Sequence, residues 1–261
     1  MCIRDRLSED GRCHEQVAGI LQRVLLQTPT QARAWNTLAS LRWGEDRREE
    51  ACQLYRLAAC LHPSHEGYAV QYFRALRALG RTAEGLQFLE RRQARLGRLA
   101  AAPSLTLSET LEEMQRPYEA QALLEQALAW RTADGDLLLG LAEHLGRNGD
   151  AQGCQALLTQ AEPLCRRAAW LRAAVQAGMR RMDEPRQTLA WAREAAMLEP
   201  LAVGAHRLCV TLLEQGEGSE AADAYVEALA AEYPHHLGIA ELQVERCLLY
   251  TSPSPRDKRQ S

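Results

Sequence analysis

A spacing of about 34 residues recurs along the chain and constrains its fold more than any other feature. Pro29 and Pro63 stand 34 residues apart, and so do Pro200 and Pro234. The step from Pro29 to Pro200 is 171 residues, which equals five such spacings plus one residue. Self-similarity at this period is typical of repeat proteins, in which each unit buries its apolar face against its neighbours. We therefore expect an array of similar units.

Apolar residues within each period follow helical spacing. Leu123, Leu124, Ala127 and Leu128 recur at steps of three and four, without the alternation typical of strands. Glycines mark the expected reversals between helices: Gly44, Gly80, Gly149, Gly216 and Gly218. Two other reversals carry prolines, Pro117 and Pro185, which suit the first turn of a helix because the missing N–H costs nothing there. The pattern predicts pairs of antiparallel helices and no strand.

Small residues recur where the two helices of each pair should cross. They are Ala51, Gly85, Ala120, Cys154, Thr188 and then Ala221 or Ala222. Four residues further on stand Tyr55, Leu89, Leu124, Leu158, Ala192 and Tyr225, most of them bulky. The second copy departs from this pattern, with Phe73 at a position that should be small and Arg92 where alanine is expected. We expect its helix packing to differ from that of the other copies.

The residues between Pro29 and Pro63 match a known repeat family. In order they are Trp35, Leu38, Ala39, Ala51, Tyr55 and Ala58. Over residues 14–246 the sequence resembles a tetratricopeptide repeat (TPR) protein. The resemblance implies an all-α solenoid of antiparallel helix pairs that forms a right-handed superhelix. Within a body of residues 7–246 we expect a half unit at 14–29, about six units over 32–236 and a truncated helix at 237–246.

Both ends of the chain have an unusual coding pattern. A DNA string that encodes residues 1–5 has a reverse complement that encodes residues 247–251, and residues 252–257 resemble a sequencing adapter. The one lysine, Lys258, lies in this tail, whereas the body uses arginine, as GC-rich bacterial genomes do. We interpret residues 1–6 and 247–261 as adapter-encoded, the latter as a disordered tail, and the body as an internal fragment of a longer bacterial protein.

No motif for catalysis or cofactor binding is found. Phosphate-binding loops, zinc-protease motifs and nucleophile elbows are missing from the sequence, and the histidine pairs His62/His65 and His235/His236 lack further ligands at suitable spacing. We expect no enzyme activity, no cofactor and no metal. Apolar runs fall short of the roughly 18 residues that a membrane span needs, so no membrane segment is expected. The six cysteines of the body read as small buried residues in a reducing compartment, which favours a cytoplasmic location.

Three classes of function remain open. The leading one is a protein-interaction scaffold, because stacked helix pairs form an extended concave surface and nothing catalytic accompanies them. The second is a non-catalytic TPR arm of a larger bacterial enzyme of the glycosyltransferase or sulfotransferase type. The third is an RNA-binding helical repeat, which would need a basic groove. Without the two tails the body has 26 basic and 32 acidic residues, a net charge of −6, which argues against nucleic acid as a partner.

The resemblance also implies which residues face the concave groove. Counted along the first helix of each unit, these include Arg33, Asn36, Ser40, Trp43 and Gly44, then Gly67, Val70, Arg74, Arg77 and Ala78, then Glu109, Glu112 and Glu113, followed by Asp136 and Glu143. The groove should be basic over the first two units and acidic over the next two. We expect a peptide or protein partner, with an acidic extended peptide at Arg33, Asn36, Trp43, Arg74 and Arg77. The dicarboxylate clamp of some TPR proteins needs lysine and asparagine at positions that Asn36 and Ser40 do not reproduce, so that ligand is not carried over.

Overall fold

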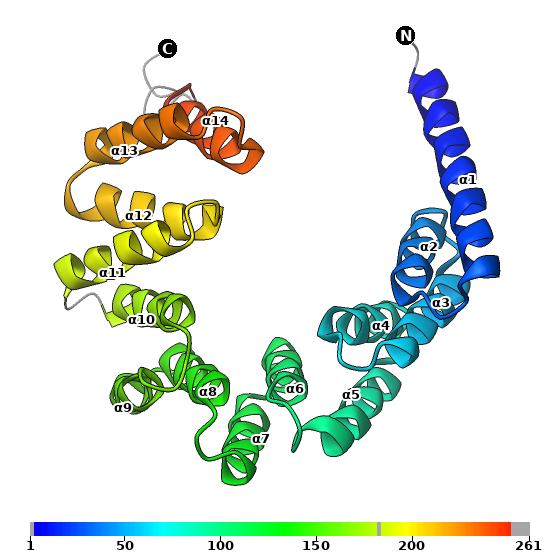
Figure 1. The fold of residues 1–261 in the computed structure, drawn as a ribbon, viewed down its shortest axis with the longest axis horizontal. Coiled ribbons are helices and arrows are strands. Elements are labelled where there is room, and N and C mark those ends of the chain that lie inside the picture. Colours follow the sequence, from blue (N-terminus) through cyan, green and yellow to red (C-terminus); the bar gives the residue numbers. More distant parts are fainter. Residues whose placement is uncertain (1–2, 182–183, 252–261) are drawn as a thin grey trace, which may run out of the picture. The chain divides into compact units, whose positions relative to one another are not determined.

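The computed structural model describes residues 3–181 and 184–251, with side chains over 15–181 and 184–246, and this described part contains helices and no strand (Figure 1). In chain order the helices are α1 (Ile3–Gln27), α2 (Ala32–Gly44), α3 (Arg48–Leu61), α4 (Glu66–Ala78), α5 (Thr82–Leu96), α6 (Ala102–Glu113), α7 (Pro117–Trp130), α8 (Gly135–Arg147), α9 (Ala151–Ala161), α10 (Arg167–Arg181), α11 (Pro185–Leu198), α12 (Val203–Gly216), α13 (Ser219–Glu232) and α14 (Leu237–Thr251). None of these helices is both long and apolar enough to cross a membrane. The chain divides after Trp130 into two compact units.

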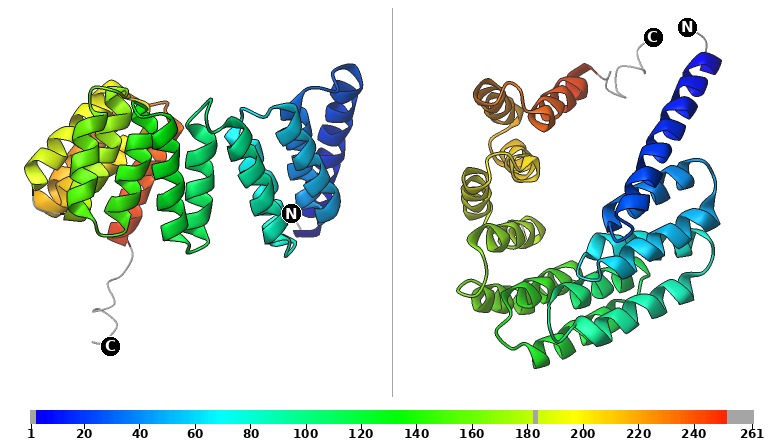
Figure 2. Two further views of the ribbon diagram at one scale, coloured as in Figure 1. Left: turned by 90° about the horizontal axis from the view of Figure 1, so that it is seen from below. Right: turned by 45° about the vertical axis from the view of Figure 1, so that its right-hand side comes forward.

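In the first unit, consecutive helices pack on one another from α1 to α7, and α4 also contacts α6 (Figure 2). Ala18 and Leu25 of α1 form a buried cluster with Ala34 and Leu38 of α2. In the second unit α8 packs on α9 and α10, and consecutive helices pack from α10 to α14. The predicted all-helical array of antiparallel helix pairs is confirmed.

Several of the turns between helices share one backbone conformation. A residue with positive φ follows α2, α4, α6 and α8 at Asp46, Gly80, Gln115 and Gly149, at steps of 34, 35 and 34 residues. In each case the next N–H bonds to a carbonyl five residues earlier, as Arg81 N does to Leu76 O at 2.8 Å. The repeat period is thus present in the backbone itself. The predicted turn signal Gly44 differs, because it is the last residue of α2 and the reversal falls at Asp46.

The predicted crossing positions are buried in every helix pair. Ala51, Ala120 and Ala222 are fully inaccessible to solvent, and Ala222 rather than Ala221 fills the last of these positions. Pro117 and Pro185 begin α7 and α11, as the missing N–H of proline predicts. Close approach of the two helices in each pair is therefore a property of the whole array.

The second copy packs well despite its unusual residues. Phe73 is 1% exposed and faces Gly85, where an added methyl group would lie 2.9 Å from Phe73 Cδ2. Arg92 is buried and spans from α5 to the start of α4, where it pairs with both oxygens of Glu66 and donates from Nε to Pro63 O at 3.1 Å. The glycine makes room for the phenyl ring, and the arginine links α5 to the segment that precedes α4.

Two helices extend beyond their predicted ends. The half unit was expected to begin at residue 14, but its helix begins at Ile3, and the last helix was expected to end at residue 246 but continues to Thr251. No proline interrupts either extension, so the backbone can continue as helix. The adapter interpretation of residues 1–6 and 247–261 concerns the coding DNA and stays a prediction. Residues 252–261 of the predicted tail 247–261 lie outside the described residues.

Candidate functional site

The first helices of the pairs line one side of the first unit. Helices α2, α4 and α6 lie in a row along this side, which we call the inner face, and α3, α5 and α7 lie along the opposite side (Figure 1). All five predicted groove residues lie on α2 or α4. The position of each side chain decides how it can take part in binding.

Arg74 and Arg77 share one carboxylate. Both are exposed residues of α4, one turn apart, and both reach Glu113 at the end of α6. Arg74 Nη2 lies 3.6 Å from Glu113 Oε1, and Arg77 Nη1 lies 3.5 Å from Glu113 Oε2. The two guanidinium groups are thus spaced so that each contacts a different oxygen of a single carboxylate.

Three polar residues follow one another along α2. Arg33 is exposed, and Asn36 is half-buried one turn further on. The amide oxygen Oδ1 of Asn36 is buried and has no hydrogen-bond partner among the described residues. The Ser40 hydroxyl lies 3.1 Å from the hydroxyl of Tyr55, which belongs to α3. Asn36 therefore carries an acceptor that the described part of the chain leaves unused, which costs free energy unless something binds it.

Trp43 is placed differently from the other four residues. Its ring packs against a buried cluster that includes Ala39, Ala51 and Tyr72, so it helps to join α2, α3 and α4. The guanidinium of Arg48 lies 5.9 Å from the ring centroid. The side chain is half-buried, so only part of the indole remains exposed for a ligand. Its first role is in packing.

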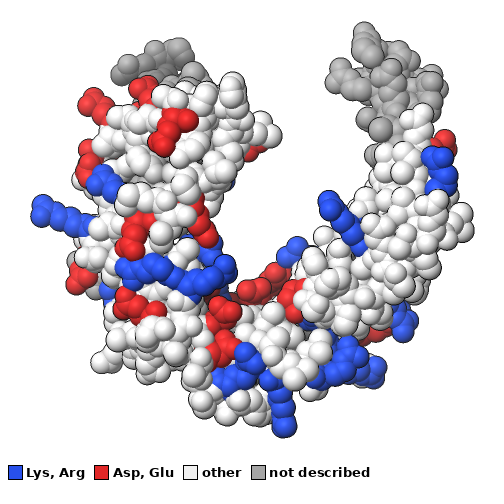
Figure 3. All heavy atoms as spheres, viewed as in Figure 1, with Lys and Arg blue, Asp and Glu red and all other residues white. Residues whose placement is uncertain are grey.

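Acidic residues follow the basic ones along the inner face. Glu109, Glu112 and Glu113 lie on α6, and Figure 3 shows acidic side chains gathered over this helix. The predicted change from basic helices to an acidic one is therefore present in the first unit. The sequence analysis did not foresee that Glu113 contacts the arginines of α4. The packing of α4 on α6 brings Glu113 close to the arginines. These residues all stand at positions that the repeat pattern assigns to the groove, and this shared assignment could have indicated the contact.

Two histidines and a tyrosine lie together where α3 ends and α4 begins. The His65 and Tyr68 rings stack at the start of α4 with their centroids 3.9 Å apart, and His62 stands edge-on to both rings. Among the described residues, no group of three or more histidine, cysteine, aspartate or glutamate side chains could hold a metal ion.

Comparison with known proteins gives structural matches only. No protein-family profile matches the sequence, and no curated protein does. A TPR protein from Parabacteroides merdae matches with 12% identity and a TM-score of 0.57, over 91% of this chain and 94% of that one. A thermophilic TPR protein from Thermus thermophilus matches with 18% identity and a TM-score of 0.51, over 70% of this chain and 98% of that one.

A third match is to the APC/C hetero-tetramer Cut9–Hcn1, with 14% identity and a TM-score of 0.50. It covers 89% of this chain but only 46% of that one. At these sequence identities the matches show a similar fold and nothing further. They agree with the 34-residue period, the buried crossing residues and the periodic reversals, and the chain has the fold of tetratricopeptide repeat proteins.

Proposed function

We propose that this chain is a protein-interaction scaffold and that the inner face of its first unit binds an extended acidic peptide. TPR folds generally serve as scaffolds for protein–protein interaction. The observation that carries the proposal is the contact of Arg74 and Arg77 with Glu113. The Glu113 carboxylate takes the place that a carboxylate of a bound peptide would occupy.

Displacing Glu113 from the arginines costs little. The side chains of Arg74, Arg77 and Glu113 are 65%, 47% and 48% exposed, and the two contacts are long. Ion pairs this exposed contribute about 0 to 1 kcal/mol to stability. A peptide carboxylate held by two arginines as well as by neighbouring contacts can therefore compete with Glu113.

The residues of α2 supply the remaining contacts. Asn36 is half-buried, and after rotation of its side chain the unused Oδ1 can accept a backbone N–H of an extended peptide, which offers such donors at regular intervals. Arg33, one turn earlier, can pair with a second carboxylate, and the exposed part of Trp43 can add apolar contact. The peptide would thus be recognised through both its backbone and its acidic side chains.

The proposal is tested with a fluorescent oligoglutamate peptide and anisotropy measurements. Arg74→Ala combined with Arg77→Ala should weaken binding by about tenfold or more, because two charge-assisted contacts are lost. Arg91→Ala combined with Arg95→Ala is the matched control, since these two exposed arginines lie on α5, on the opposite side of the unit.

Binding should also weaken as salt rises, because the ions screen exposed charges. Equal affinity of the two double variants would place any peptide site elsewhere. Far-UV circular dichroism checks that both variants remain helical.

A further inference from the structure

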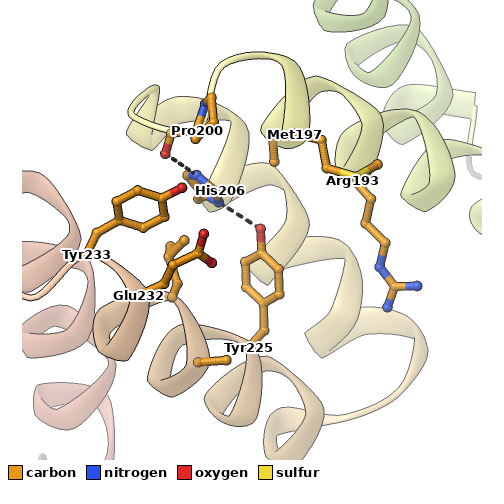
Figure 4. Close-up of a pocket in the computed structure, with 10 residues that line it drawn as sticks. Arg193, Met197, Pro200, His206, Tyr225, Glu232 and Tyr233 are labelled. Carbon is orange, nitrogen blue, oxygen red and sulfur yellow. Dashed lines mark hydrogen bonds between the residues drawn. The ribbon is translucent and has the colours of Figure 1, made fainter.

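The second unit contains a pocket that the proposed peptide site does not use. It has a volume of about 440 Å³ and lies among the end of α11, the start of α12 and the last two turns of α13 (Figure 4). Its lining includes Met197, His206, Tyr225, Glu232 and Tyr233. Apolar surface dominates the lining, so the charge of the few polar groups decides what it can bind.

His206 is a buried residue of the pocket lining. It is 4% exposed, and its Nε2 donates a hydrogen bond to the carbonyl oxygen of Pro200 at 2.8 Å. Trp35 makes the same bond to Pro29 in the first repeat, also across six residues. Histidine thus replaces the tryptophan of the repeat pattern. An imidazole is smaller than an indole, so this replacement leaves space beside Tyr225 and Tyr233.

Both ring nitrogens of His206 are engaged in hydrogen bonds within the chain. Nε2 donates to Pro200, and Nδ1 lies 2.7 Å from the Tyr225 hydroxyl. Burial raises the pKa of the Tyr225 phenol, which therefore stays protonated and uncharged at physiological pH. These two residues present aromatic surface to the pocket.

Glu232 supplies a negative charge at the pocket. Its carboxylate lies between the rings of Tyr225 and Tyr233, and the Arg193 guanidinium points away from it (Figure 4). Arg193 instead approaches Glu217, with 3.8 Å between Nη2 and Oε1. In the described part of the chain no basic side chain forms an ion pair with Glu232. The nearby Glu232 carboxylate raises the pKa of the Tyr233 phenol, so this ring is neutral too.

Aromatic rings together with a carboxylate favour one kind of ligand in this pocket. Aromatic faces attract cations through their quadrupole, and the attraction grows when the cation is partly desolvated. The carboxylate adds a Coulomb attraction and repels anions. Apolar walls favour a cation that carries carbon around its charge over a compact hydrated one. We propose that this pocket binds an alkylated ammonium group, held by the rings of Tyr225 and Tyr233 and by the Glu232 carboxylate.

Two ligands of the same shape, one charged and one uncharged, test whether the pocket requires a positive charge. Choline carries a trimethylammonium group, whereas 3,3-dimethyl-1-butanol has the same shape without the charge. Isothermal titration of the full chain should show choline binding about tenfold more tightly than the alcohol, because only choline gains the Coulomb and cation–π attraction. Equal affinities, or no heat from choline, would overturn the proposal.

Variants then assign the binding to this pocket. Glu232→Gln should lower choline affinity several-fold, whereas Glu220→Gln, an exposed glutamate in the first turn of the same helix, should not. Tyr233→Phe keeps the ring and should preserve binding, whereas Tyr233→Leu should reduce it. Unchanged binding by both Glu232→Gln and Tyr233→Leu would place the cation elsewhere and contradict the proposal.

The ammonium group can belong to a free small molecule or to a methylated lysine of a protein. A peptide with trimethyl-lysine is therefore compared with the same peptide carrying unmodified lysine. Preference for the methylated peptide over choline indicates a protein segment as the ligand, and preference for choline indicates a small molecule. If both peptides and choline bind no better than the uncharged alcohol, the pocket has no cation site.

Discussion

The helix pairs α2/α3 and α4/α5 reach the same close crossing with different residues. In α2/α3 both facing positions hold a small residue, Ala39 and Ala51, and each is fully buried. In α4/α5 one position holds Phe73, and the facing position holds Gly85, which has no side chain. The comparison shows that the repeat does not require a particular residue at each crossing position, because a large ring on one helix is accommodated where the facing residue has no side chain.

The two pairs also differ in how the second helix ends. Ala58 of α3 is fully buried, as the repeat pattern predicts, whereas Arg92 stands at the equivalent position of α5. The arginine side chain extends to the start of α4, where it pairs with Glu66 and donates to the carbonyl oxygen of Pro63. Polar bonds here replace the apolar contact of the alanine, and the geometry of the hairpin is kept.

The largest expected effect comes from removing this polar link. Arg92→Ala should lower the free energy of unfolding by about 2 to 4 kcal/mol, because it leaves Glu66 and the Pro63 carbonyl without their partner. Urea unfolding followed by circular dichroism measures the change. Arg91→Ala, at the exposed neighbouring position, is the control and should have little effect. A midpoint for Arg92→Ala equal to that of the control would show that the link does not stabilise α4/α5.

A larger side chain at the small crossing of α2/α3 should have the next largest effect. Ala51→Leu should destabilise the fold by about 1 to 3 kcal/mol through overpacking, and Ala120→Leu should do the same in α6/α7. Ala94→Leu, at an exposed position of α5, is the control. A neutral urea midpoint for Ala51→Leu would mean that the crossing tolerates more volume than the comparison implies.

Substituting alanine for glycine at two helical positions should give opposite signs. At Gly85 the new methyl group would meet Phe73 Cδ2 at 2.9 Å, so Gly85→Ala should destabilise by about 1 kcal/mol, a loss that Phe73→Leu should relieve. At Gly44 nothing lies within 4 Å, so Gly44→Ala should stabilise by about 0.5 to 1 kcal/mol through helix propensity. If both variants stabilise, Gly85 is not required for the crossing.

The fold could be predicted from the sequence because the period is carried by local features. Small residues such as Ala51 and Ala120 repeat at nearly constant steps, and prolines such as Pro117 begin helices. The packing of the second copy could not be predicted in the same way. Each of Phe73, Gly85 and Arg92 looks unfavourable or neutral alone, and only the contacts between helices show how they compensate.

The site was predictable in part. The repeat register placed Arg74, Arg77 and Glu113 on groove positions, but it treats each helix separately and so did not pair them. The pocket beside His206 was missed for a related reason. It depends on which side chains neighbouring helices present, and this information is not contained in the spacing of residues along the chain.

The affinity of Glu113→Gln for the oligoglutamate peptide tests the central claim most directly. If the Glu113 carboxylate occupies the ligand position on Arg74 and Arg77, its removal frees the two arginines without disturbing the buried core. The variant should then bind the peptide more tightly, by up to about fivefold, which corresponds to an exposed ion pair of about 1 kcal/mol. Weaker or unchanged binding would show that Glu113 does not stand in for a ligand and would contradict the proposed site.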